Sequence, residues 1–167
     1  MIIKNPKVLV IDDEFGLRDG IKRLLEPEGF IVDTAENGTQ GIEKGTSFEY
    51  DVYILDLKMP DINGLDVLSN IRKKYPEAIC IIMTGHGSID SAVEATKIGA
   101  YAYLTKPFMP DDLLAHLIRG VERRWYILEA KRLKEEQNRR LLEIAYEQTR
   151  LKTIINSIAD GILIINE

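Results

Sequence analysis

The sequence predicts an α/β fold in which five strands form a doubly wound parallel sheet, followed by a long C-terminal helix. Short apolar runs alternate along the first two thirds of the chain with stretches in which apolar residues recur at helical spacing. This alternation is typical of βαβ units with right-handed crossovers. In addition, no proline occurs from Leu113 to Ile158 and Gly120 is the one glycine there, which favours a single uninterrupted helix.

The first part of the chain contains two expected strand–helix pairs. Residues Lys7–Ile11 form a nearly continuous apolar run, as in parallel strands that are covered on both faces. Residues 15–25 have apolar side chains at helical spacing, and Pro27 favours the end of that helix. A second strand is expected over residues 30–35 and a short helix over residues 38–46.

Three further strands and three helices are expected after residue 50. The helices have apolar residues every three or four positions, and Pro76 ends the first of them. The strand before Thr84 is the most apolar of all. The expected strands are residues 50–56, 78–84 and 101–105, and the expected helices are residues 64–75, residues 88–99 and a last one from Asp111.

The last helix has the pattern of a coiled coil. Two stripes alternate spacings of four and three residues: Leu114, Ile118, Val121, Trp125 and Leu128, then Leu141, Ile144, Gln148, Leu151, Ile155 and Ile158. The stripes are out of phase across the polar segment 131–140, which favours a local stutter. A helix of about 65 Å is longer than a domain of this size. We therefore expect a homodimer that forms through this coiled coil, and not a helix that folds back on its own domain.

Composition excludes several classes of protein. The net charge of −5 argues against a general nucleic-acid binder, which needs a basic surface. No apolar stretch approaches the roughly 20 residues of a membrane span, and no signal peptide is evident, so a cytoplasmic protein without a membrane anchor is expected. Cys80 is the one cysteine and lies in an apolar run, which favours a buried structural thiol.

Polar side chains end several of the expected strands. Asp12 and Asp13 follow the first strand, Asp56 ends the third, Thr84 the fourth, and Lys106 follows the fifth. Asp56 alone could simply begin a turn. Ligands of such sheets, however, bind at the carboxyl ends of the strands, where these residues are expected to meet. Clustered carboxylates need a cation, and oxygen ligands without a Cys/His cluster predict Mg²⁺.

These groups suit phosphoryl transfer. A carboxylate beside Mg²⁺ and a lysine can attack phosphorus to give an acyl phosphate, because the reaction depends mainly on positioning and charge neutralisation. The sequence has neither of the glycine-rich loops that bind nucleotides, so the phosphoryl donor is expected to be another molecule. Any catalysis within this chain is then limited to its own phosphorylation and dephosphorylation.

Together, these motifs closely resemble the receiver domain of bacterial two-component response regulators. They are Asp12-Asp13, Asp56 in LDLKMPDINGLD, Thr84-Gly85 in IIMTGHG, and Lys106-Pro107-Phe108 in AYAYLTKPF. The resemblance covers about residues 5–122 and implies a flavodoxin-like sheet with strand order 2-1-3-4-5.

The resemblance assigns the acceptor and the metal ligands. It implies that Asp56 accepts the phosphoryl group. Asp13 corresponds to a direct Mg²⁺ ligand, Asp12 to an acid that acts largely through water, and the backbone carbonyl of Lys58 to the third protein ligand.

It also assigns the switch residues. Thr84 corresponds to a hydroxyl that turns toward the phosphoryl group. Lys106 corresponds to the cation that pairs with the phosphoryl oxygens, and the Lys106-Pro107 bond corresponds to a cis peptide of the family. Tyr103 corresponds to an aromatic side chain that moves inward on activation. His86 is either an exposed loop residue or a group that alters the lifetime of the acyl phosphate.

The expected organisation has three parts: a receiver domain over residues 1–122, a coiled-coil signalling helix over 123–158, and the start of a truncated PAS domain over 159–167. The tail INSIADGILIINE resembles the junction into a PAS domain, with a turn at Asp160-Gly161 and then a strand-like run. We therefore expect the chain to be cut at the beginning of another domain.

The expected function is a phosphorylation-dependent signalling switch. The resemblance implies a histidine kinase or a phosphotransfer protein as the donor, and an output domain reached through the C-terminal helix. The alternative is a receiver-like scaffold that dimerises through its coiled coil without phosphorylation.

Overall fold

The computed structural model describes residues 5–85 and 89–165. The chain divides into two compact units, residues 1–127 and residues 128–167. The division falls within one continuous helix, and each unit is described by itself.

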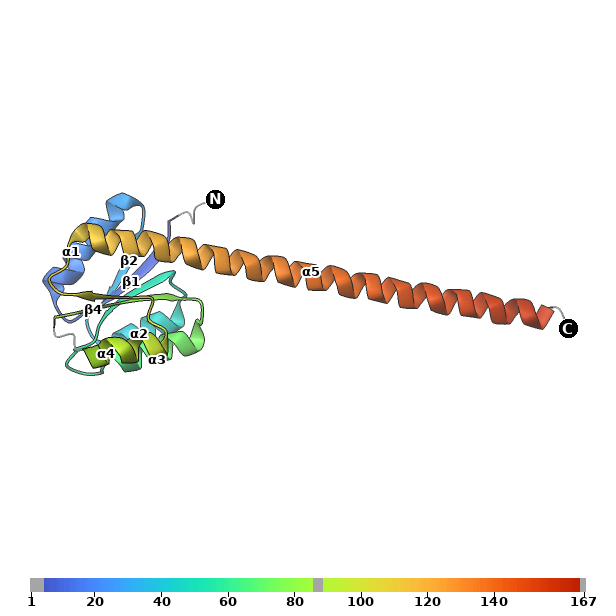
Figure 1. Cartoon of the computed structure of the whole chain (residues 1–167), viewed down its shortest axis with the longest axis horizontal. Coiled ribbons are helices and arrows are strands. Elements are labelled where there is room, and N and C mark those ends of the chain that lie inside the picture. The colour runs from blue at the N-terminus through green and yellow to red at the C-terminus, as the bar shows by residue number, and fades with distance from the viewer. Residues whose placement is uncertain (1–4, 86–88, 166–167) are drawn as a thin grey trace. The chain divides into compact units, whose positions relative to one another are not determined.

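The first unit is built on a five-stranded sheet in which every neighbouring pair of strands is parallel. The strand order is β2-β1-β3-β4-β5, which confirms the predicted doubly wound α/β fold. The strands are β1 Lys7–Ile11, β2 Ile31–Ala35, β3 Val52–Asp56, β4 Ile79–Thr84 and β5 Ala102–Thr105. In Figure 1, the helices of this unit cover the sheet on both faces.

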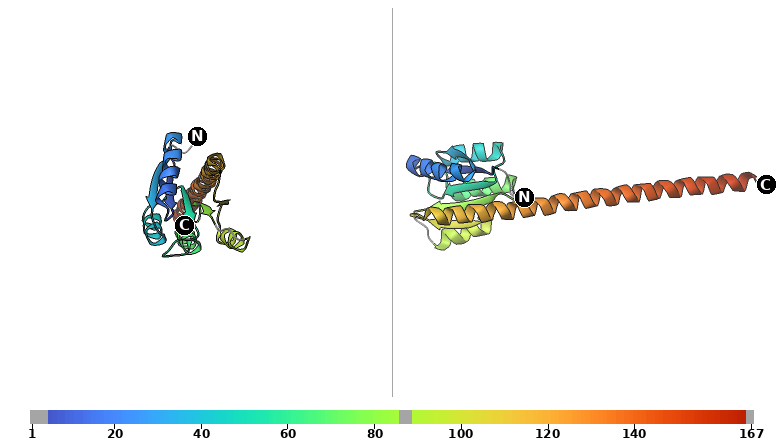
Figure 2. Two further views of the ribbon diagram at one scale, coloured as in Figure 1. Left: turned by 90° about the vertical axis from the view of Figure 1, so that its left-hand side faces the viewer. Right: turned by 90° about the horizontal axis from the view of Figure 1, so that it is seen from above.

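Helices α1 and the first part of α5 lie on one face of the sheet, and α2, α3 and α4 lie on the other (Figures 1 and 2). The predicted bounds of the elements in this unit differ from the observed ones by at most two residues. The helices are α1 Phe15–Leu25, the 3-10 turn η1 Glu26–Glu28, α2 Gly38–Ser47, α3 Gly64–Lys74, α4 Ile89–Ile98 and α5 Pro110–Ile165.

The core has two halves separated by the sheet. Along β1, Val8 and Val10 pack toward α1 and α5, whereas Leu9 and Ile11 pack toward α2 and α3. Every residue of β3 and β4 is buried. This double coverage is the reason why the strands read as continuous apolar runs in the sequence. Cys80 is buried in the second half, as predicted.

The first predicted coiled-coil stripe is wrong as a continuous seam. Leu113, Leu117 and Val121 of α5 are buried in the core, although the predicted stripe includes Val121. Ile118, another member of the stripe, is 44% exposed. The first turns of α5 must cover the sheet, so their apolar pattern reflects packing within the domain.

The predicted turn and strand-like run after Asp160 are also wrong, because α5 continues through Gly161 to Ile165. A helix satisfies its backbone hydrogen bonds locally, whereas a lone strand needs a partner. The start of a PAS domain stays a prediction.

The second unit is helical and presents apolar side chains to solvent. Its predicted stripe is exposed, with Leu141, Ile144, Leu151, Ile155 and Ile158 between 53% and 63% exposed. Leu133, Leu142, Tyr146 and Ile154 are exposed as well, so the apolar surface is broader than one seam. Within the described parts of the chain, no helix is long and apolar enough to cross a membrane.

Candidate functional site

Three carboxylates meet at the C-terminal edge of the sheet. Asp12 follows β1, Asp56 ends β3, and Asp13 is adjacent to Asp12. One oxygen from each side chain lies within 4.8 Å of the others. Asp12 is fully buried and Asp56 is 6% exposed, whereas Asp13 is exposed. The structure thus brings the predicted acids together, with one of them open to solvent.

Lys106 supplies the cation of the site. Its Nζ atom lies 2.7 Å from Oδ2 of Asp12 and 2.7 Å from Oδ2 of Asp56, and its side chain is 14% exposed. Glu14 is farther away, at 3.7 Å. The Lys106 backbone N–H donates to the Thr84 carbonyl, and the Lys106–Pro107 peptide is cis, as the resemblance to receiver domains implies. One ammonium therefore bridges two buried acids from different strands.

The electrostatics of the cluster leave an excess of negative charge. Burial raises the pKa of Asp12, although the hydrogen bond from Lys106 opposes this effect. Burial lowers the pKa of Lys106, but its hydrogen bonds to Asp12 and Asp56 outweigh burial and raise it overall. Lys106 is therefore protonated at neutral pH. A single ammonium does not balance three carboxylates, which favours binding of a divalent cation.

The donor set fits Mg²⁺, which prefers carboxylate oxygens. Local hydrogen bonds orient two of the carboxylates: the Glu14 N–H donates to Asp12 at 2.8 Å, and the Lys58 N–H donates to Asp56 at 3.1 Å. The Lys58 side chain is exposed. The role of its backbone carbonyl as a metal ligand stays a prediction.

The loop from β3 to α3 is fixed at both ends. Asn63 caps α3 by accepting from the Leu65 N–H at 2.9 Å. Gly64 packs so closely that a Cβ atom there would lie 2.1 Å from the Asp56 carbonyl oxygen. Gly64 is the first residue of α3, so this close contact holds the start of the helix against the backbone of Asp56.

Asp61 is a residue of this loop that the sequence analysis did not identify. It accepts hydrogen bonds from the Gly38 and Thr39 N–H groups at 3.0 and 2.8 Å, and from the Thr39 hydroxyl at 2.7 Å. These bonds, led by the one from the Thr39 hydroxyl, hold the pKa of Asp61 well below its usual range. Asp61 thus anchors the loop to the N-terminus of α2.

The predicted switch residues lie on the two neighbouring strands β4 and β5. Thr84 ends β4 and is 1% exposed. Tyr103 of β5 is half-buried, and its hydroxyl lies 3.1 Å from the Ser91 hydroxyl of α4. This contact links β5 to α4. His86 lies outside the described residues.

Comparison with known proteins finds similarity to response regulators. A family model described as the response regulator receiver domain matches residues 8–118. The chain is 37% identical over 117 residues to the cell cycle transcriptional regulator CtrA of Caulobacter vibrioides, covering 70% of this chain and 51% of that protein. It is 43% identical over 117 residues to an NtrX-like response regulator of Rickettsia typhi, covering 69% of this chain and 25% of that one. The chain thus spans about half of the length of the first relative and a quarter of the second.

The fold is also similar to solved structures of receiver domains. A receiver domain protein from Clostridium thermocellum shares 41% identity at a TM-score of 0.69, covering 73% of this chain and 98% of that one. The beryllofluoride-activated NtrC4 receiver domain dimer shares 36% identity at a TM-score of 0.67, covering 71% and 98%. With this strand order and a lysine bridging the acids at the sheet edge, the chain belongs to the response regulator receiver domain family.

Proposed function

We propose that the chain is a phosphorylation-dependent signalling switch in which Asp56 accepts a phosphoryl group from a histidine kinase or a phosphotransfer protein. The observation that carries this proposal is the contact of one ammonium, that of Lys106, with both Asp12 and Asp56 at 2.7 Å. Such a site holds an acceptor carboxylate beside a fixed positive charge, which phosphoryl transfer requires.

In the proposed reaction, a carboxylate oxygen of Asp56 attacks the phosphorus atom of a phosphohistidine. The new O–P bond forms as the P–N bond breaks, and the imidazole nitrogen keeps the electron pair. Lys106 then donates to a phosphoryl oxygen instead of to Asp56, and Thr84 donates from the end of β4. Autodephosphorylation is the attack of water on the same phosphorus atom, with Asp56 as the leaving group.

Mg²⁺ would be held by Asp13, Asp56 and the Lys58 carbonyl, with Asp12 acting on it largely through water. When bound, it would neutralise the negative charge that develops on the phosphoryl oxygens. The fit of three carboxylates whose oxygens lie within 4.8 Å of one another supports this assignment.

The signal passes through Thr84 and Tyr103 in this proposal. An acyl phosphate adds close to two negative charges at the sheet edge, so it favours whichever conformation places Thr84 and Lys106 against it. Movement of Tyr103 changes its contact with Ser91 and hence the packing of α4 on β5. Helix α5 follows β5 directly and is the route to an output domain.

We further propose that residues 123–158 form a homodimeric coiled coil after a receiver domain over residues 1–122, and that residues 159–167 begin a PAS domain. The exposed stripe from Leu141 to Ile158 supports the coiled coil, because a partner helix would cover it. The solved NtrC4 receiver, activated with beryllofluoride, is itself a dimer.

Intact-mass analysis after incubation with Mg²⁺ and acetyl phosphate tests the acceptor. The wild-type chain is expected to gain one phosphoryl group and Asp56→Asn none, while Asp66→Asn, at an exposed position of α3, serves as the control. No gain in the wild type, or an equal gain in Asp56→Asn, would contradict the proposal.

The second candidate function is a scaffold that dimerises without phosphorylation. The exposed apolar stripe favours it, since a stripe of this kind can pair in any phosphorylation state. Sedimentation with and without beryllofluoride separates the two functions. A dimer of unchanged affinity supports the scaffold, and a tighter dimer on activation supports the switch.

A further inference from the structure

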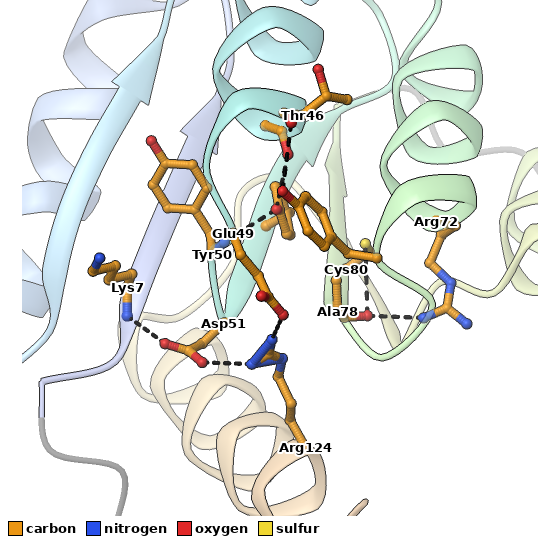
Figure 3. A network of polar contacts seen from close by, with 12 residues as sticks. Lys7, Thr46, Glu49, Tyr50, Asp51, Arg72, Ala78, Cys80 and Arg124 are labelled. Atoms are coloured by element: carbon orange, nitrogen blue, oxygen red, sulfur yellow. Dashed lines mark hydrogen bonds and ion pairs between the residues drawn. The ribbon is translucent and has the colours of Figure 1, made fainter. Parts of the chain in front are cut away.

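A second charged cluster, built around a buried arginine, lies at the opposite end of β3 from Asp56. We call it the Arg124 cluster, and it consists of Arg124, Asp51 and Glu49 (Figure 3). Arg124 of α5 is 3% exposed. Its Nη1 atom donates to Asp51 at 2.7 Å, and its Nη2 atom donates to Glu49. The cluster therefore ties α5 to the segment that leads into β3.

Asp51 is itself held by the sheet on two sides. Its Oδ2 atom accepts from the Lys7 N–H at 2.8 Å, and its own N–H donates to the Lys7 carbonyl at 2.8 Å. Its carbonyl accepts from the Ile79 N–H at 3.3 Å. Asp51 thus connects the beginnings of β1, β3 and β4, and it offers Arg124 a fixed point of attachment.

A buried arginine is a costly way to join a helix to a sheet. Its charge loses hydration, and Nε of Arg124 is buried without a hydrogen-bond partner among the described residues. Apolar side chains of similar volume often stabilise such a contact as well or better. A guanidinium differs from them because its donors have fixed directions, so the pairs with Asp51 and Glu49 specify how α5 is rotated on the sheet.

The contacts of Arg124 orient the end of the first unit. Arg124 lies in the last turn before Ile127, the final residue of the first unit. Strand β3, which is buried throughout, runs from Val52, next to Asp51, to Asp56. We propose that Arg124 is a positioning residue that holds the last turn of α5 in this unit against the start of β3. Changes at Asp56 then reach α5 through the strand as well as through Tyr103. This second step rests on the proposed function.

Hydrogen exchange of the unphosphorylated chain tests the holding role. In Arg124→Met, the amides of residues 121–127 are expected to exchange at least about tenfold faster than in the wild type, while those of residues 113–117 stay unchanged. Arg119→Met, which changes an exposed arginine of the same helix, is the control. Exchange within about twofold of the wild type in Arg124→Met would overturn the proposal.

Arg124→Met leaves the Asp51 carboxylate without its cation, so the double variant Asp51→Asn/Arg124→Met is measured beside it. The double variant removes the uncompensated charge and keeps the sheet contacts of the Asp51 backbone. It is expected to fold and still to show faster exchange over residues 121–127. Wild-type exchange there would show that the charged pair does not hold the helix.

Coupling to Asp56 is tested with Trp125, the one tryptophan of the chain, which follows Arg124. Beryllofluoride with Mg²⁺ is expected to change Trp125 emission in the wild type and in Arg119→Met, but to change it at least about threefold less in Arg124→Met. An equal change in all three overturns the coupling. Intact mass after acetyl phosphate treatment is recorded for each chain. A wild type without phosphate contradicts the proposed function, while the exchange experiment still decides the role of Arg124.

Discussion

Lys106 Nζ lies 2.7 Å from Oδ2 of Asp12, a residue 94 positions earlier in the chain. Asp12 is fully buried, so this contact compensates a carboxylate that has no access to water. The same ammonium also contacts Asp56. Any ligand that draws Lys106 away from Asp56 therefore changes the charge balance at Asp12.

Lys106→Met is expected to lower the free energy of unfolding by roughly 3 kcal/mol without Mg²⁺, because two buried carboxylates lose their cation. Mg²⁺ should restore more stability to this variant than to the wild type, since the cluster becomes more negative. Urea unfolding with and without Mg²⁺ measures both effects. Lys97→Met, at an exposed position of α4, is the control. An equal response to Mg²⁺ in Lys106→Met and the wild type would show that Lys106 and the metal do not share a site.

Asp13→Asn is expected to separate metal binding from stability. Asp13 is exposed and adds negative charge beside Asp12, so its neutralisation should leave the metal-free chain as stable as the wild type or more so. Its affinity for Mg²⁺ should fall at least about tenfold, because one carboxylate ligand is lost. Calorimetric titration with Mg²⁺ measures the affinity, and Glu14→Gln is the control. A change of less than about twofold in Asp13→Asn would exclude Asp13 as a ligand.

The parts of the fold and site that the sequence predicted correctly are those marked by local pattern. The strands are buried on both faces and so appear as apolar runs, and Asp56 and Thr84 end such runs. Asp61 and Arg124 were missed because their partners lie far away in the sequence, 22 residues for Thr39 and 73 for Asp51. The periodicity of apolar residues, which reveals strands and helices, does not indicate polar pairs that are so far apart in the sequence.

The two wrong predictions have a similar origin. Val121 fits a coiled-coil spacing, but the same spacing also serves a helix that covers a sheet. The apolar residues after Gly161 are compatible with a strand or a helix, and short apolar runs do not distinguish the two.

Asp61→Ala is expected to weaken Mg²⁺ binding without removing a ligand. The substitution eliminates three hydrogen bonds that hold the loop after Asp56 to α2, so the Lys58 backbone is less well positioned. The thermal midpoint should also fall. Thr39→Val removes one of the three bonds and should give a smaller loss of both. Glu36→Ala removes a charge at the same end of α2 and is the control. Unchanged Mg²⁺ affinity in a less stable Asp61→Ala chain would limit the role of Asp61 to stability.

Two glycine substitutions are expected to have opposite effects. Gly64→Ala places a Cβ atom 2.1 Å from the Asp56 carbonyl oxygen and 2.7 Å from Leu57 Cα, so it should cost more than about 4 kcal/mol or prevent folding. Gly20→Ala lies within α1 with nothing within 4 Å of the new atom. It should stabilise the chain by up to about 1 kcal/mol through helix propensity. Urea midpoints compare the two, and similar midpoints would contradict the packing at Gly64.

Stability is expected to fall at alkaline pH because buried groups hold their protons more tightly in the folded chain. Burial raises the pKa of Tyr50 to about 12, aided by its hydrogen bond to Asp33, and burial raises the pKa of Cys80 to about 12. The unfolded chain releases these protons near pH 10 and about pH 8.5 respectively, so between those values and about pH 12 the folded state binds more protons. The free energy of unfolding therefore declines as pH rises through this window.

Tyr50→Phe isolates the contribution of one of these groups. The variant loses the hydrogen bond to Asp33 and should be less stable than the wild type at neutral pH. Its free energy of unfolding should nevertheless fall less steeply between about pH 10 and 12, since it has no phenol to ionise at this position. Tyr126→Phe, at a site that is 66% exposed, should keep the wild-type slope. Urea unfolding across this range measures the three curves. Parallel curves for Tyr50→Phe and the wild type would show that the Tyr50 proton is not held by the fold.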